Sequence, residues 1–196
     1  SSRPASGTDH QFSHYWDMEG LCYDGKHVSH GFKVSIGTLV STACLEYLIS
    51  KDLGAMDIDK AVAEWPEWDE MERRIRATFE GKPGHLARGL VESNGKYIDR
   101  EGIRKELEIV KNTWPELREK IRNQIIPFDE VHDCLRRVGA PYEPEMIGVS
   151  REKLRSTFRA IPFMRNRFTG IDLIYRAGLM DEVEEYLFGA GGHYEC

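Results

Sequence analysis

Apolar residues recur at helical spacing along most of the chain. The longest such stretch opens at Asp99 and carries Ile103, Leu107, Val110, Trp114, Leu117 and Ile121. Steps of four and three place these side chains on one face of a helix. A second apolar helix is expected from Thr38 to about Ser50. We therefore predict a chain that is helical nearly throughout.

Capping residues, prolines and glycines divide the rest of the pattern into shorter helices. Asp9 is a candidate N-cap for the first helix, and Asp57 or Asp59 for a short one ending near Trp65. Further helices are expected over about 66–81, 84–95, 127–139, 150–158, 171–180 and 181–189. The pattern shows no repeat, no alternating strand pair and no GxGxxG loop. These observations predict one all-α multi-helix bundle over residues 1–196.

Three segments depart from the simple helical pattern. Residues 22–29 form a predicted loop with turn chemistry at Asp24-Gly25. The front half of 30–50 is rich in glycine and β-branched residues, which indicates extended backbone or a tight approach. Pro115 interrupts the longest helix, and Thr113 with Glu116 matches a capping box, so a kink or restart is expected there.

Composition excludes several classes of function. The net charge is −6 and the basic residues are dispersed, which argues against nucleic-acid binding, and short basic clusters such as Arg165-Asn166-Arg167 fit a solvated surface. No run approaches the roughly 20 apolar residues of a membrane helix. No two of the four cysteines form a CxxC pair, and Cys44 and Cys134 lie in apolar helical patterns. Reduced thiols and a cytoplasmic location are therefore expected.

Candidate chemistry is concentrated near the start of the chain. His10 and His14 lie one helical turn apart, and His30 precedes a glycine that lets backbone approach a ligand. Imidazole suits Zn²⁺, Ni²⁺ or Fe²⁺. Taken alone, however, such a pair is more often made of core or surface histidines, and a catalytic metal site usually takes three protein ligands. Lys33 is either solvated or a cation near a phosphate or cofactor.

The motifs around these histidines resemble a known family. SGTDHQFSH followed by VSHGFKVSIGTL is similar to the C-terminal half of the sn-glycerol-1-phosphate dehydrogenases, which belong to the iron-containing alcohol dehydrogenase and dehydroquinate synthase-like superfamily. Asp9 stands where that family usually has Glu. RVGAPYEPEMIGVSREKLRSTF and RNRFTGIDLIYRAGLMDE resemble its closing helices, while residues from about 51 to 123 are less characteristic.

The resemblance implies a role for each of the three histidines. His10 and His30 match the family's two metal-ligating histidines, and His14 matches a catalytic histidine that contacts substrate near the nicotinamide. The implied cofactors are a divalent metal (Zn, Ni or Fe) and NAD(P), and the implied substrate is a small phosphorylated molecule. The implied reaction interconverts dihydroxyacetone phosphate and sn-glycerol 1-phosphate.

The resemblance also implies that parts of the site lie outside this chain. The family's third metal ligand is an upstream aspartate, and its dinucleotide site lies in an N-terminal α/β domain. Neither fits in the nine residues before His10. The chain also opens on SSRPASG, without Met, close to its densest motif. We therefore expect a C-terminal domain taken from a longer enzyme and catalytically inactive alone.

Three other interpretations are weighed against this one. A 3-dehydroquinate synthase favours GHT-x-GHA-x-E and HGEAV, which fit poorly, whereas a glycerol dehydrogenase shares the HG-x-KV element. A non-catalytic helical interaction module could retain the histidines as a relic. Homo-oligomer formation is left open, with Trp65, Trp68 and the glycine-rich tail as candidate contacts.

Overall fold

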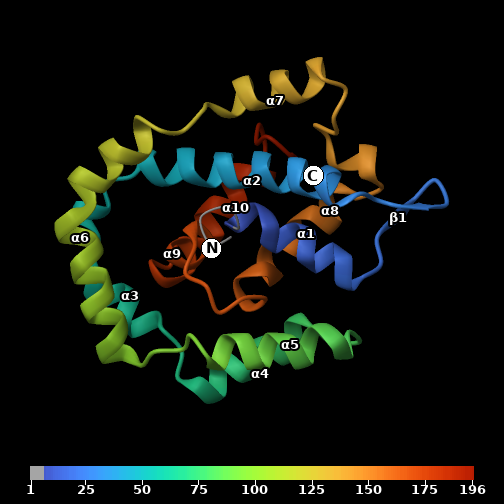
Figure 1. Cartoon of the computed structure of the whole chain (residues 1–196). Coiled ribbons are helices and arrows are strands. Elements are labelled where there is room, and N and C mark those ends of the chain that lie inside the picture. The colour runs from blue at the N-terminus through green and yellow to red at the C-terminus, as the bar shows by residue number, and fades with distance from the viewer. Residues whose placement is uncertain (1–6) are drawn as a thin grey trace.

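The computed structural model describes residues 7–196, which form an almost wholly helical fold (Figure 1). The α-helices are α1 (Thr8–Met18), α2 (His30–Ser50), α3 (Ile58–Glu64), α4 (Trp68–Thr78), α5 (Pro83–Asn94), α6 (Arg100–Arg122), α7 (Phe128–Arg137), α8 (Arg151–Ala160), α9 (Gly170–Arg176) and α10 (Met180–Phe188). Short 3₁₀ turns are η2 (Leu53–Ala55), η3 (Pro144–Ile147) and η4 (Ile161–Phe163). The predicted all-α class is confirmed.

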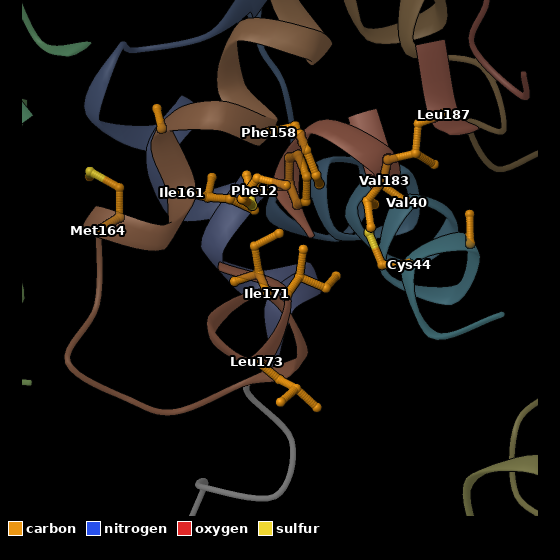
Figure 2. Packing of buried hydrophobic residues seen from close by; sticks show 14 of the residues in the cluster. Phe12, Val40, Cys44, Phe158, Ile161, Met164, Ile171, Leu173, Val183 and Leu187 are labelled. Atoms are coloured by element: carbon orange, nitrogen blue, oxygen red, sulfur yellow. The ribbon is translucent and has the colours of Figure 1, made fainter. Parts of the chain in front are cut away.

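The central core joins helices from both ends of the chain. In Figure 1, α6, α4 and α5 run around the outside of the view, with α1, α9 and α10 inside. Figure 2 shows side chains of α1, α2, α8, α9 and α10 meeting in one cluster, including Phe12, Val40, Phe158, Ile171 and Val183. All five are fully buried. Burial of apolar area against this cluster stabilises α1 and α2 in their mutual arrangement.

The crossing of α1 and α2 depends on Gly37. A Cβ atom at this position would lie 2.3 Å from the carbonyl oxygen of Asp9. Glycine is therefore required for the two backbones to approach this closely. The tight approach expected in the front half of 30–50 is confirmed, but the extended backbone is wrong, because α2 is helical from His30 onward. Ser29 caps it by accepting a hydrogen bond from the Phe32 amide.

Two further local predictions need correction. α1 begins two residues earlier than expected, with Gly7 rather than Asp9 at the N-cap, so Asp9 lies inside the first turn. The predicted loop at 22–29 contains a small antiparallel hairpin of β1 (Cys22–Tyr23) and β2 (Lys26–His27). The expected turn residues do connect these strands, with Asp24 and Gly25 both at positive φ.

α6 runs through Pro115 without a restart. The helix is continuous over its whole length. The hydroxyl of Thr113 donates to the carbonyl of Ile109 at 2.7 Å inside the helix, so it does not cap a new one. Trp114, fully buried, donates from its indole to the carbonyl of Lys51 at 3.1 Å. Such tertiary contacts hold the segment helical despite the proline.

Several exposure predictions change in the structure. Cys44 is buried as its pattern indicates, whereas Cys134 is exposed, because α7 rests on the fold by only part of its surface. Trp65, taken as an exposed contact residue, is 6% exposed, and its indole donates to the Ile98 carbonyl. Trp68 is half-buried. The Asp57 cap is confirmed, and the side chains of Asp99 and Ser150 cap α6 and α8 in the same way.

One helix within residues 7–196 is long and apolar enough to be compared with a membrane span. It is α2, whose most apolar window is 61% buried inside the fold. Such burial is typical of the central helix of a core.

Candidate functional site

One face of α1 carries most of the polar groups of the candidate site. His10, Ser13, His14 and Asp17 follow one another at steps of three, one and three residues. This spacing places them on the same side of the helix. His30 is the first residue of α2 and approaches the same face because the two helices cross at Gly37. The site is thus built at the junction of α1 and α2.

The three predicted histidines are brought together. The ring centroids of His10 and His30 are 5.3 Å apart, those of His14 and His30 6.0 Å, and those of His10 and His14 6.4 Å. A tetrahedral cation roughly 2.0–2.1 Å from each nitrogen holds two imidazole centroids about 5 Å apart. The separation of His10 and His30 therefore fits a shared metal ion.

Hydrogen bonds fix one nitrogen on each of these two rings. The Nδ1 atom of His10 lies 2.8 Å from Oδ2 of Asp9, and the Nδ1 atom of His30 lies 2.9 Å from Oγ of Ser13. Within residues 7–196, neither Nε2 atom has a hydrogen-bond partner. A partner on one imidazole nitrogen orients the ring and leaves the other nitrogen for a metal. Asp9 and Ser13 are placed to do this.

An ion pair between a buried lysine and an exposed carboxylate adjoins the histidines. Lys33, only 5% exposed, pairs through Nζ with Oδ1 of Asp17. The other carboxylate oxygen of Asp17 is 3.8 Å from Nδ1 of His30 and 4.0 Å from Nδ1 of His14. Asp17 therefore connects the buried lysine to two of the three rings. Lys33 is not a solvated lysine, since its charge is held inside the fold.

The electrostatic surroundings of His14 favour the neutral ring. Burial lowers its pKa most, and the positive charges of Arg165 and Arg88 lower it further, while Asp17 opposes the shift. A neutral imidazole can accept a hydrogen bond at one nitrogen and donate at the other. His14 is therefore suited to contact a substrate hydroxyl or carbonyl.

The described residues supply only part of a metal-binding site. In the region 7–196, no group of three or more His, Cys, Asp and Glu side chains is arranged to hold a metal ion. His10 and His30 are a pair of donors, one fewer than the three protein ligands common at catalytic zinc. The remaining histidines lie elsewhere: His85 is buried beside Tyr15, and His132 lies 3.2 Å from Glu143.

Sequence reasoning missed two residues of this arrangement, because it assigned no role to Ser13 or Asp17. The signal was nonetheless in the sequence, because positions 10, 13, 14 and 17 share one helical face. The interaction of Lys33 with Asp17 connects two helices, so no local pattern could have revealed it.

Comparisons with known proteins give a consistent result. The chain is 24% identical over 179 residues to glycerol-1-phosphate dehydrogenase [NAD(P)+] of Bacillus licheniformis. The matched segment is 91% of the chain and 31% of that protein. The chain is also 24% identical over 169 residues to the enzyme of the same name from Geobacillus stearothermophilus, or 86% of the chain and 32% of the relative. No family model and no solved structure matches.

The chain thus spans about a third of the length of the curated relatives it matches. The similarity covers 86–92% of the chain in these relatives. The relationship expected from those motifs is confirmed: the chain is related to the glycerol-1-phosphate dehydrogenases and is consistent with a C-terminal fragment of that family.

Proposed function

We propose that this chain is the helical, metal- and substrate-binding domain of a glycerol-1-phosphate dehydrogenase. The enzyme would interconvert dihydroxyacetone phosphate and sn-glycerol 1-phosphate with NAD(P). The observation that carries the proposal is the 5.3 Å separation of the His10 and His30 rings, with His14 beside both, in a chain related to enzymes of that name. The proposed location is the cytoplasm, without nucleic-acid or membrane partners.

In this proposal each histidine has a separate task. His10 and His30 would hold a divalent cation (Zn²⁺, Ni²⁺ or Fe²⁺) through their free Nε2 atoms, while Asp9 and Ser13 keep the two rings in position. When bound, such a cation polarises a substrate carbonyl as a Lewis acid. His14 contacts the substrate oxygen from the same helix face and orients it. The ion pair of Lys33 and Asp17 holds the polar ends of α2 and α1 together next to the histidines.

We further propose that the dinucleotide site and the remaining metal ligand belong to an α/β domain outside this chain. The relatives are about three times as long as the matched segment, which leaves room for such a domain. Sheet structure within residues 7–196 is limited to the small hairpin β1–β2, which offers no dinucleotide crevice. The chain by itself is therefore proposed to be inactive.

Activity assays on two polypeptides test this proposal. The 196-residue chain and the product of its complete gene are each supplied with Zn²⁺ or Ni²⁺ and assayed with NADH and NADPH. Dihydroxyacetone phosphate, free dihydroxyacetone and dehydroquinate precursors are compared as substrates. We expect turnover with dihydroxyacetone phosphate by the longer protein only. Robust turnover by the short chain, or preference for the free ketose, would contradict the proposal.

A further inference from the structure

The segment that follows η4 lies between α5 and α1. Met164, which ends this turn, is labelled in Figure 2. The backbone amide of Asn166 donates to Oε2 of Glu92 on α5 at 2.9 Å, and the hydroxyl of Thr169 donates to Oε1 of Gln11 on α1 at 3.2 Å. The residues between these two anchors are therefore held next to the helix that carries His14.

Side chains alternate along this segment. Arg165 and Arg167 are half-buried, whereas Asn166 and Phe168 are exposed. The two arginines are thus partly covered by the fold, although the sequence pattern assigns them to a solvated surface. A third guanidinium comes from α5, where Arg88 donates from Nε to the carbonyl of Met164 at 3.4 Å. Three cationic groups from two segments are thereby gathered at one place.

The arginine charges repel one another, and those of Arg165 and Arg88 act on His14. Burial lowers the pKa of Arg165 most, and the charges of Arg88 and Arg167 lower it further. Arg165 and Arg88 also lower the pKa of His14, so both lie close enough to affect that ring. The chain as a whole carries a net charge of −6, so this local excess of positive charge stands out. Like charges held together at a site favour binding of an anion.

The nearest carboxylate is shared with other groups and does not pair with Arg165. Glu92 is the acidic group that acts on Arg165, but its oxygens already receive the Asn166 amide and, at 3.4 Å, Arg88. Among residues 7–196, Arg165 has no ion-pair partner. On the other side of His14, Asp17 is paired with Lys33. The Arg165 guanidinium is therefore a half-buried cation available to an external ligand.

We propose that Arg165, assisted by Arg88, forms the subsite that binds the phosphate group of the substrate. A guanidinium presents paired N–H donors that match two phosphate oxygens, which suits this anion better than a single carboxylate. On α5, His85 lies about one turn before Arg88, and its Nε2 atom is 3.2 Å from the carbonyl oxygen of Tyr15, the residue after His14. The subsite therefore lies on the side of α1 where one small molecule can reach both Arg88 and His14. This inference rests on the proposed function and names the residues that recognise the phosphorylated end of its substrate.

The experiment uses inorganic phosphate as the probe and the metal-free 196-residue chain. Histidine ring signals are followed by NMR during the titration, and the His14 signal is assigned with His14→Gln. We expect saturable movement of the His14 signal with phosphate, and none with equal concentrations of chloride. Because a hydrogen bond to a charged group contributes strongly, Arg165→Gln is expected to weaken phosphate binding roughly tenfold or more. Arg88→Gln is expected to weaken it less.

Matched variants separate the subsite from general effects. Arg136→Gln removes an exposed arginine on α7 and should leave the titration unchanged. Arg165→Lys keeps the positive charge, so its phosphate affinity should lie between those of wild type and Arg165→Gln. This conservative variant also controls for loss of folding. The proposal is overturned if phosphate leaves the His14 signal unmoved, or if Arg165→Gln and Arg165→Lys both bind as wild type does.

The same samples distinguish this proposal from the proposed function. His10→Ala should lose Zn²⁺ binding and keep the phosphate response, whereas Arg165→Gln should show the reverse. A phosphate response that depends on Arg165, in a complete gene product that binds no Zn²⁺, would support the anion subsite while contradicting the metal-dependent function. Zn²⁺ binding without any phosphate response would reject the subsite alone.

Discussion

Gly37 lies directly against the backbone of Asp9: a Cβ atom on the glycine would be 2.3 Å from the carbonyl oxygen of Asp9. Asp9 precedes His10 on α1, and Gly37 lies about two turns after His30 on α2. The closeness of the two backbones therefore sets the 5.3 Å separation of the two histidine rings. A packing constraint and a chemical arrangement depend on the same crossing.

Gly37→Ala is predicted to destabilise the fold and weaken metal binding together. The atom in the way is a backbone oxygen, which cannot rotate aside as a side chain can. Separation of α1 from α2 should cost about 1–3 kcal/mol of unfolding free energy, as overpacking typically does. Urea unfolding and Zn²⁺ titration measure the two effects.

Gly31→Ala is the matched control on the same helix. No atom lies within 4 Å of a Cβ built at Gly31, and its φ is not positive. Alanine favours helix over glycine by up to about 1 kcal/mol, so this variant should be as stable as wild type or more so. Equal loss of stability in both variants would show that close packing at Gly37 is not the cause.

The two proposed ligands and their supporting residues should contribute to metal affinity in a graded order. His10→Ala or His30→Ala is predicted to abolish measurable Zn²⁺ binding, because only one imidazole donor then remains. Ser13→Ala removes the partner of the His30 Nδ1 atom and should weaken binding about 10- to 100-fold. Isothermal titration calorimetry measures these affinities. His132→Ala, on α7, is the control and should bind Zn²⁺ as wild type does. If this variant fails to bind Zn²⁺, the metal site is not the one formed by His10 and His30.

Much of this site follows from local patterns in the sequence. The spacing of His10 and His14 predicts their shared face, and the motif around His30 supplies the third ring. The three rings come together only because α1 crosses α2. In the sequence, Gly37 indicates a close approach of two backbones but does not show which residue it approaches. That partner is Asp9, 28 positions earlier, so only the tertiary fold identifies it.

The ion pair of Lys33 and Asp17 shows the same limit of prediction from sequence. Lys33 belongs to the apolar run of α2, and its pattern does not show whether the charge is solvated. In the structure it is 5% exposed, and Asp17 of α1 provides the compensating carboxylate. A buried charge is tolerated where a partner compensates it, and the partner of Lys33 lies on another helix. Arg165 is the complementary example, since its basic cluster resembles an ordinary surface in the sequence.

The ion pair of Lys33 and Asp17 should respond unequally to loss of each partner. Asp17→Asn leaves the buried ammonium without a carboxylate, whereas Lys33→Met fills the same space with an apolar side chain. Because the Asp17 side chain is 41% exposed, solvent reduces the effect, and we expect about 1–3 kcal/mol for Asp17→Asn and under about 1 kcal/mol for Lys33→Met. Chemical denaturation of both single variants and the double variant gives the interaction free energy between Lys33 and Asp17. Equal losses would mean that the pair does not stabilise a buried charge.

Pro115 offers a test of how tertiary packing overrides local preference. Proline in a helix interior removes one hydrogen bond and costs about 3 kcal/mol relative to alanine, yet α6 continues through it. The anchoring of Trp114 to Lys51 holds the helix in place. Pro115→Ala is therefore predicted to raise the unfolding free energy by about 1–3 kcal/mol without changing the far-ultraviolet circular dichroism. Lower stability would show that the proline serves a structural need. Glu116→Ala, on the exposed side of α6, should change little and serves as the control.

Cys44 should differ from the other cysteines in reactivity and in its effect on stability. Burial raises the pKa of its thiol to about 12, whereas Cys22, Cys134 and Cys196 are exposed. Because the thiolate is the reactive form, native protein at pH 8 should show three fast thiols toward a disulfide reagent and a fourth only after unfolding.

The same shift predicts a dependence of stability on alkaline pH. The unfolded thiol ionises near 9, and the folded one only near 12. The contribution of Cys44 is therefore complete below pH 9 and is lost as the pH rises toward 12, by up to about 1.4 kcal/mol per pH unit. Comparison with Cys44→Ala at pH 7 and pH 10 cancels the titration of lysines and tyrosines. The stability advantage of wild type should shrink at the higher pH; a constant advantage would mean that the thiol is accessible to solvent in the folded state.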